Sequence, residues 1–109
     1  MQSGEFKALV QSVIDEDQAS VQYYLSQGID PNFLHPEILT TPLVEASRNG
    51  NVSISELLLQ HGADPLLDSL IGESPLKIAK QNKNKVLVQL FTKKKKSPFS
   101  LHKLFKKLN

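Results

Sequence analysis

The sequence predicts an all-α fold: a short solenoid of three helix–turn–helix repeats with extended, hairpin-like loops and a basic C-terminal helix. Two observations carry this prediction. Residues 41–50 (TPLVEASRNG) align without gaps with residues 74–83 (SPLKIAKQNK), 33 positions later. A second landmark, residues 27–31 (QGIDP), recurs 34 positions later as residues 61–65 (HGADP). Similarity at a period of this length is typical of repeat proteins, in which each unit buries its apolar face against its neighbours.

The composition fits one globular domain held together without disulfides. The chain has 109 residues, of which 39% are apolar and 22% charged, and it has no cysteine. The absence of cysteine excludes disulfides, thiolate catalysis and cysteine-based zinc sites within this sequence. Neither a signal peptide nor an apolar run long enough to cross a bilayer is visible. We therefore expect an intracellular protein located in the cytoplasm.

The first unit, about residues 5–37, is predicted as two helices joined at an acidic turn, residues 15–17 (DED). Asp17 can cap the second of these helices, since its side chain can accept a hydrogen bond from a backbone N–H in the first turn. The unit lacks the Thr-Pro-Leu start of the next one but keeps its closing Gly28 and the following Asp-Pro-Asn. A divergent terminal unit is expected in a short stack, because its outer face meets water.

The second unit, about residues 38–70, contains every landmark. Thr41 is the expected N-cap of its first helix, and Pro42 occupies the first helical position, where a missing N–H costs nothing. Gly50 suits the left-handed residue that ends this helix, and Gly62 ends the next one in the same way. The apolar residues between these two glycines supply the buried face of the second helix.

The third unit, about residues 71–91, repeats the start of the second with Ser74 and Pro75 but has no closing Gly-Ala-Asp. Lys80 falls where the second unit has a small residue. A lysine would sit poorly between two repeats, and it is tolerable near the end of the stack, where the ammonium reaches solvent.

This pattern resembles the ankyrin repeat. The family's T-P-L-H-x-A stretch appears here as residues 41–46 (TPLVEA) and 74–79 (SPLKIA), and its Gly-Ala-Asp as residues 62–64. The family's motif histidine is replaced by Val44 and Lys77, so we expect the hydrogen bonds that it usually anchors to be absent. The loop of the first unit is one residue longer than its counterpart, which predicts a local bulge.

The sequence offers little that could support catalysis, a cofactor or a metal. The three histidines, His35, His61 and His102, lie apart from one another and are interpreted as surface residues. The glycines are scattered, so no phosphate-binding loop is present, and the acidic turn at residues 15–17 is explained by helix capping. We therefore predict a protein that is not an enzyme and has no small-molecule substrate.

The resemblance implies a concave face, made of inner helices and loop tips, that grips a partner protein. Both loop tips carry apolar pairs where solvent is expected, and exposed apolar clusters tend to mark partner surfaces. Alternatively, the loops could fold back and bury these residues against each other. The predicted partner-binding residues are Ile38, Leu39, Arg48, Asn49, Leu70, Ile71, Glu73 and Gln81.

The C-terminal residues 92–109 differ in charge from the rest of the chain. Residues 1–91 carry six basic and eleven acidic side chains, a net charge of −5, whereas residues 92–109 carry seven lysines and no acid. Leu101, Leu104, Phe105 and Leu108 share one face of a predicted helix. The lysines of this tail are Lys93, Lys94, Lys95, Lys96, Lys103, Lys106 and Lys107.

Four roles for this tail remain open. It could cap the exposed end of the third unit, bind an anionic membrane, bind nucleic acid or a nuclear import receptor, or enter an acidic groove of a partner. Its charge could also attract the acidic body of another copy, which would give weak head-to-tail self-association. The leading hypothesis for the whole chain is a protein-binding adaptor or inhibitor. The alternative is a module whose basic tail recruits the repeats to an anionic membrane or nucleic acid.

Overall fold

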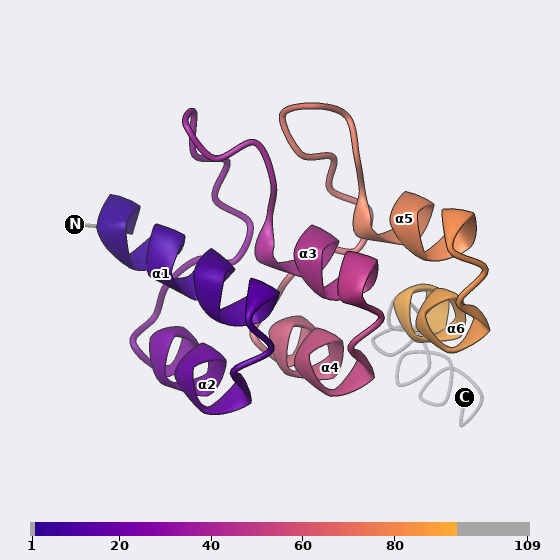
Figure 1. Cartoon of the computed structure of the whole chain (residues 1–109), viewed down its shortest axis with the longest axis horizontal. Helices are drawn as coiled ribbons and strands as arrows, with labels where there is room; N and C mark the ends of the chain where they lie inside the picture. Colours follow the sequence, from indigo (N-terminus) through magenta and orange to yellow (C-terminus); the bar gives the residue numbers. More distant parts are fainter. Residues whose placement is uncertain (1, 94–109) are drawn as a thin grey trace, which may run out of the picture.

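The computed structural model describes residues 2–93, with side chains from Gly4 onward. Six helices form three antiparallel pairs that stack in a row (Figure 1). We call α1, α3 and α5 the inner helices and α2, α4 and α6 the outer helices. Their bounds are α1 Gln2–Ile14, α2 Gln18–Ser26, α3 Pro42–Asn49, α4 Val52–Gln60, α5 Pro75–Gln81 and α6 Lys85–Lys93. The all-α repeat architecture predicted from the sequence is confirmed.

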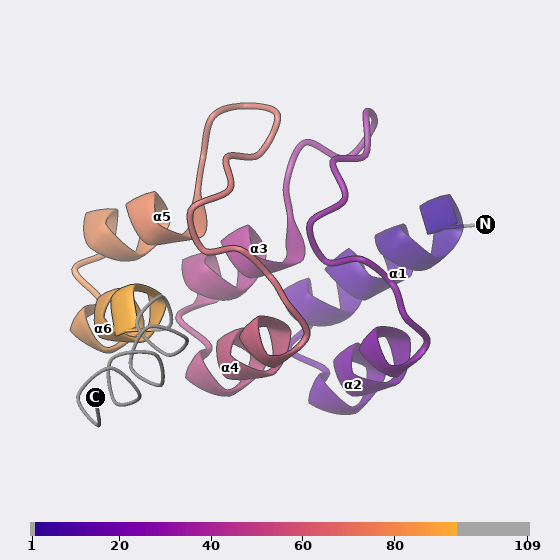
Figure 2. The same ribbon diagram turned by 180° about the vertical axis from the view of Figure 1, so that it is seen from behind.

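Two long loops connect the pairs and rise from the same edge of the stack (Figure 2). We call residues 27–41 the first finger and residues 61–74 the second finger. Each finger leaves the end of an outer helix and returns to the start of the next inner helix. Both fingers therefore extend beyond the inner helices on one side, away from the row of outer helices.

Three of the helices begin at the capping residues that the sequence indicated. The Thr41 hydroxyl accepts a hydrogen bond from the Val44 N–H at 3.2 Å, and Ser74 does the same for Lys77 at 3.2 Å. Asp17 caps α2 by accepting from the Ser20 N–H at 3.2 Å. These bonds satisfy backbone donors that have no partner within the first turn of a helix.

One apolar core runs through all three pairs. Helix α3 packs between α1 and α5, while α4 packs against both α2 and α6. The largest fully buried apolar side chains come from every pair: Phe6, Leu9, Ile54, Leu58, Leu87 and Phe91. Since each short helix pair has too little apolar surface of its own, stacking supplies the burial that makes the fold stable.

Candidate partner-binding surface

The tip of the second finger is a tight turn closed by Ser69. The backbone N–H of Ser69 donates to the Glu73 carbonyl at 2.7 Å, and the Gly72 N–H donates to the Ser69 carbonyl at 2.9 Å. The Ser69 hydroxyl also accepts from the Glu73 N–H at 3.2 Å. Gly72 has a φ of 82°, in the left-handed region where glycine has no steric penalty. The turn is thus fixed by its own hydrogen bonds and holds its apolar residues outward.

Three of the four predicted apolar tip residues are exposed. The exposed fraction is 51% for Leu39, 49% for Leu70 and 58% for Ile71. Ile38, the fourth, is only partly exposed, because it packs against the apolar core. The two tips therefore do not bury their apolar residues against each other, and large apolar side chains remain in contact with solvent on both fingers.

An asparagine side chain joins the bases of the two fingers. The Asn32 amide donates to the Gly62 carbonyl at 2.9 Å, and its oxygen accepts from the Asp64 N–H at 2.9 Å. Asp30 in turn accepts from the Asn32 N–H at 2.9 Å and so fixes the backbone that carries this side chain. These bonds link positions about thirty residues apart in the sequence, and they set the spacing of the fingers.

A second connection between the fingers crosses α3. Thr40, at the end of the first finger, donates its hydroxyl to Glu45 at 2.6 Å. Arg48 is 3.4 Å from the same Glu45 carboxylate. On its other side the Arg48 guanidinium holds Glu73, at the end of the second finger, with donor–acceptor distances of 2.9 and 3.4 Å. A guanidinium bound to both oxygens of a carboxylate fixes orientation as well as distance.

This pair changes the titration of both of its members. The hydrogen bond between them lowers the pKa of the Glu73 carboxyl and raises the pKa of the Arg48 guanidinium. Because the folded-state pKa of Glu73 is depressed, its contribution to stability is present above the ordinary carboxyl pKa and is lost as pH falls through the lowered value. Both side chains are partly exposed, so water screens the energy of the pair.

We expect Arg48→Gln to raise the pKa of Glu73 back toward the ordinary glutamate value. NMR titration of the Glu73 side-chain carboxyl between about pH 2.5 and 7 measures this directly. Lys77→Gln is the matched control, because it removes the nearby pair between Lys77 and Asp68 but leaves Arg48 in place. An unchanged Glu73 pKa in Arg48→Gln would show that the pair does not persist in solution.

Comparison with known proteins identifies the repeat. The family model for ankyrin repeats, in three copies, matches residues 9–100. The chain belongs to the ankyrin repeat family. The three helix pairs and the two fingers are accordingly ankyrin units, and the family as a whole generally mediates protein–protein interaction.

Several curated relatives match part of the chain. The ARF GTPase-activating protein Git of Drosophila melanogaster is 38% identical over 66 residues, which are 61% of this chain and 9% of that protein. The palmitoyltransferase AKR1 of Lachancea kluyveri is 40% identical over 68 residues, 62% of this chain and 9% of that protein. The human 2-5A-dependent ribonuclease is 41% identical over 71 residues, 65% of this chain and 10% of that protein. The chain thus spans 9–10% of the length of these curated relatives.

The two positions that replace the ankyrin motif histidine have different surroundings. Val44 is fully buried in the core. Lys77 reaches the second finger, where its ammonium lies 3.2 Å from Asp68 and donates to the Gly72 carbonyl at 3.3 Å. In the third unit, Lys77 therefore connects the inner helix α5 to the second finger. The sequence pattern had indicated only that the histidine was absent.

His35 is buried, so its interpretation as a surface residue was wrong. Its ring is stacked with Phe6, with centroids 6.4 Å apart, and meets the edge of Phe33 at 5.9 Å. The Nδ1 atom of His35 accepts a hydrogen bond from the Glu37 N–H at 3.0 Å. This cluster docks the first finger on α1. The second histidine, His61, is exposed at the end of α4, and His102 lies outside the described residues.

The remaining predicted residues have mixed surroundings. The Asn49 amide lies 3.3 Å from the Val13 carbonyl and 3.4 Å from that of Ile14, where it caps the C-terminal end of α1. It therefore joins the first two units, a role that the sequence pattern did not reveal. Gln81 is exposed at the end of α5. Glu73 and Arg48 are already bound to each other and present a paired rather than a free charge.

The described residues were also searched for metal-binding groups and membrane-spanning helices. Within residues 2–93, no group of three or more histidine and acidic residues is placed to hold a metal ion. Over the same residues no helix has the length and apolar character needed to cross a membrane. Of the tail lysines, Lys93 is exposed at the end of α6. Lys94, Lys95, Lys96, Lys103, Lys106 and Lys107 lie outside the described residues.

Proposed function

We propose that the chain is a binding module, acting as an adaptor or inhibitor, that holds a partner protein between its two fingers and inner helices. The observation that supports this most is the exposure of Leu39, Leu70 and Ile71 on fingers whose bases are hydrogen-bonded to each other. Exposed apolar side chains on a fixed frame can be buried by a partner with little loss of conformational freedom.

The relatives support a holding role over a catalytic one. Their names describe three different activities, a GTPase-activating protein, a palmitoyltransferase and a ribonuclease, yet each matches this chain over only 9–10% of its own length. A segment shared by proteins of such different chemistry is better explained by binding than by any one reaction.

The test replaces the three exposed tip residues with aspartate: Leu39→Asp, Leu70→Asp and Ile71→Asp together. Proteins retained by the wild-type chain are identified by mass spectrometry, and the affinity of the recovered partner is then measured for each variant. We expect the triple variant to lose affinity at least about a hundredfold, because it removes three apolar side chains from the interface and adds charge. Its far-UV circular dichroism and melting temperature should stay nearly unchanged, since the tips contribute little to the core.

Val86→Asp is the matched control. Val86 is as exposed as Ile71 but lies on the outer helix α6, away from the fingers. This variant should retain the partner at wild-type affinity. Equal retention by the tip variant and by wild type would contradict the proposal, and a large fall in the melting temperature of the tip variant would show that the tips are structural.

The lysine-rich tail supports a second candidate, recruitment to an anionic membrane or nucleic acid. Seven lysines and no acid occur in residues 92–109. Truncation after Lys93 separates the two candidates in the same experiment. Retention that depends on the tail and falls steeply with salt favours this second function, whereas retention that depends on the finger tips favours the first.

A further inference from the structure

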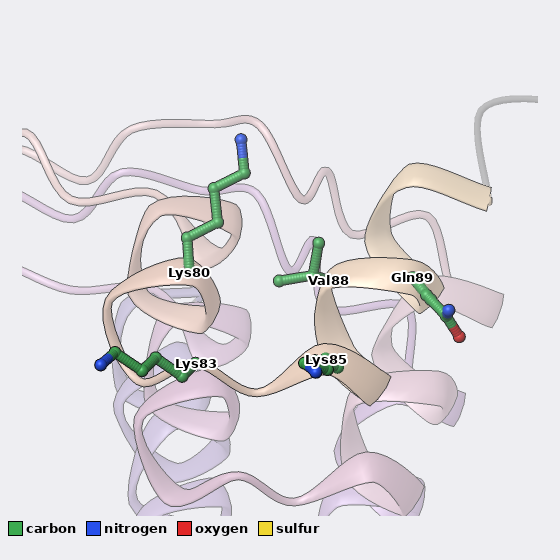
Figure 3. Close-up of a pocket in the computed structure, with 5 residues that line it drawn as sticks. All are labelled: Lys80, Lys83, Lys85, Val88 and Gln89. Atoms are coloured by element: carbon green, nitrogen blue, oxygen red, sulfur yellow. The ribbon is translucent and has the colours of Figure 1, made fainter.

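The third unit contains a hollow of about 440 Å³ between α5 and α6. It is lined by Lys80 from α5, Lys83 from the turn, and Lys85, Val88 and Gln89 from α6. Figure 3 shows Val88 between the two helices, with the lysines around it. The hollow is separate from the fingers and was not predicted from the sequence.

Repeat symmetry shows which surface this is. At the offset of 33 residues, Lys80 corresponds to Ser47 and Val88 corresponds to Ser55. Both serines are fully buried in the second unit, on which the third unit packs. The hollow therefore corresponds, on the third unit, to the surface of the second unit on which the next helix pair packs.

The side chains of the hollow differ in charge from those on the corresponding surface of the second unit. Small or neutral residues in the second unit are replaced by lysines, and Lys83 stands where the second unit has Gly50. Lys83 has a φ of 57°, a left-handed conformation that side-chain-bearing residues seldom adopt. Within residues 2–93, none of the three lysines forms a salt bridge. The hollow thus combines a partly buried valine with three lysines that have no acidic partner among the described residues.

The charge of the chain is also graded along the stack. Residues 5–37 carry six acidic and one basic side chain, a net charge of −5, whereas residues 71–93 carry five basic and one acidic, a net charge of +4. A further ankyrin unit of ordinary composition would bury Lys80 without a partner, at a large desolvation cost. The lysine-rich tail carries the same sign of charge as the hollow and would be repelled by it.

We propose that the hollow binds an acidic amphipathic helix of a partner protein. The apolar stripe of that helix packs on Val88, and its carboxylates pair with Lys80, Lys83 and Lys85. A helix with leucine and glutamate on adjoining faces meets both requirements, as in other helix-in-groove complexes. None of the residues that line the hollow belongs to the fingers, so the hollow can be occupied while the fingers hold another protein.

The test uses a labelled synthetic peptide of leucine and glutamate with its leucines on one helical face, and a counterpart with lysine in place of glutamate. The protein is the full chain with glutamine at the six lysines of residues 94–109, which removes competition from the tail. At low salt we expect amide shift changes in NMR spectra to cluster at residues 80–89 with the acidic peptide only. Adding Lys80→Gln, Lys83→Gln and Lys85→Gln should weaken binding about tenfold, as three partly desolvated ion pairs imply.

A second set of lysines provides the matched control. Lys7→Gln, Lys77→Gln and Lys93→Gln change the net charge equally but leave the hollow intact, so they should keep the peptide affinity. Lys80→Glu, Lys83→Glu and Lys85→Glu together should transfer the preference to the lysine peptide. Equal weakening by both glutamine sets, or shift changes outside the hollow, would overturn the proposal.

Two further outcomes are decisive. If sedimentation shows concentration-dependent association that the hollow variants abolish, the occupant is a second copy of this chain and the proposal is wrong. Binding of the acidic peptide by the finger-tip variant Leu70→Asp/Ile71→Asp should be normal. Loss of peptide binding in that variant would place the site at the fingers instead, so failure here is distinguishable from failure of the proposed function.

Discussion

Leu58→Ala is expected to lower the free energy of unfolding by about 3–4 kcal/mol, the largest stability effect that we predict. Leu58 lies on α4, the middle outer helix, and its side chain is fully buried. Helix α4 packs against α2, α3 and α6, so a cavity there weakens contacts between all three units. Since a domain of this size has a total stability of about 5–10 kcal/mol, the variant should be close to unfolding at moderate temperature.

Leu66→Ala is the control for the same chemical change at an exposed position. Leu66 lies on the second finger with 45% of its surface exposed, so its loss should cost less than about 1 kcal/mol. Urea denaturation followed by circular dichroism measures both variants. If the units were independently stable, Leu58→Ala would produce a two-step transition in which the first and third units remain folded, and this would contradict the single core.

Features that depend on neighbours in sequence could be predicted well. Thr41 and Ser74 cap helices through an N–H three residues away, and Gly50 needs only a local left-handed conformation. Such effects act within a few residues and leave a regular sequence signature.

Features that depend on contacts between units could not be predicted. His35 has no periodic signal in an irregular loop, and its burial comes from the rings of Phe6 and Phe33. Asn49 had the position of a surface residue, but its amide reaches the end of α1, 35 residues or more away in sequence. The lysines of the hollow come from α5, the turn and α6, and only the folded end of the stack brings them around Val88.

Asn32→Ala is expected to have the second largest effect, a loss of about 1–3 kcal/mol from two hydrogen bonds that join the fingers. One runs from the Asn32 amide to the Gly62 carbonyl, and the other from the Asp64 N–H to the Asn32 oxygen. Thermal and urea denaturation measure the loss. Amide hydrogen exchange in residues 64–73 should also accelerate, because the second finger loses its attachment to the first.

Two variants test this role of Asn32. Asn32→Asp keeps the acceptor for Asp64 but loses the donor to Gly62 and adds a charge near Asp30 and Asp64, so it should be less stable than wild type. Asn82→Ala is the control, since Asn82 is an exposed residue of the same type whose side chain makes no hydrogen bond to the described residues; it should be neutral.

The variant Asn32→Ala also tests the proposed function. If the finger tips bind the partner as a preorganised pair, Asn32→Ala must weaken that binding although Asn32 itself lies at the base, because the partner then has to order the fingers. The loss should appear with Leu39, Leu70 and Ile71 all intact. The opposite result would be full partner affinity in Asn32→Ala together with rapid amide hydrogen exchange in the second finger. It would show that binding does not require a fixed spacing of the fingers and that the apolar tips act separately.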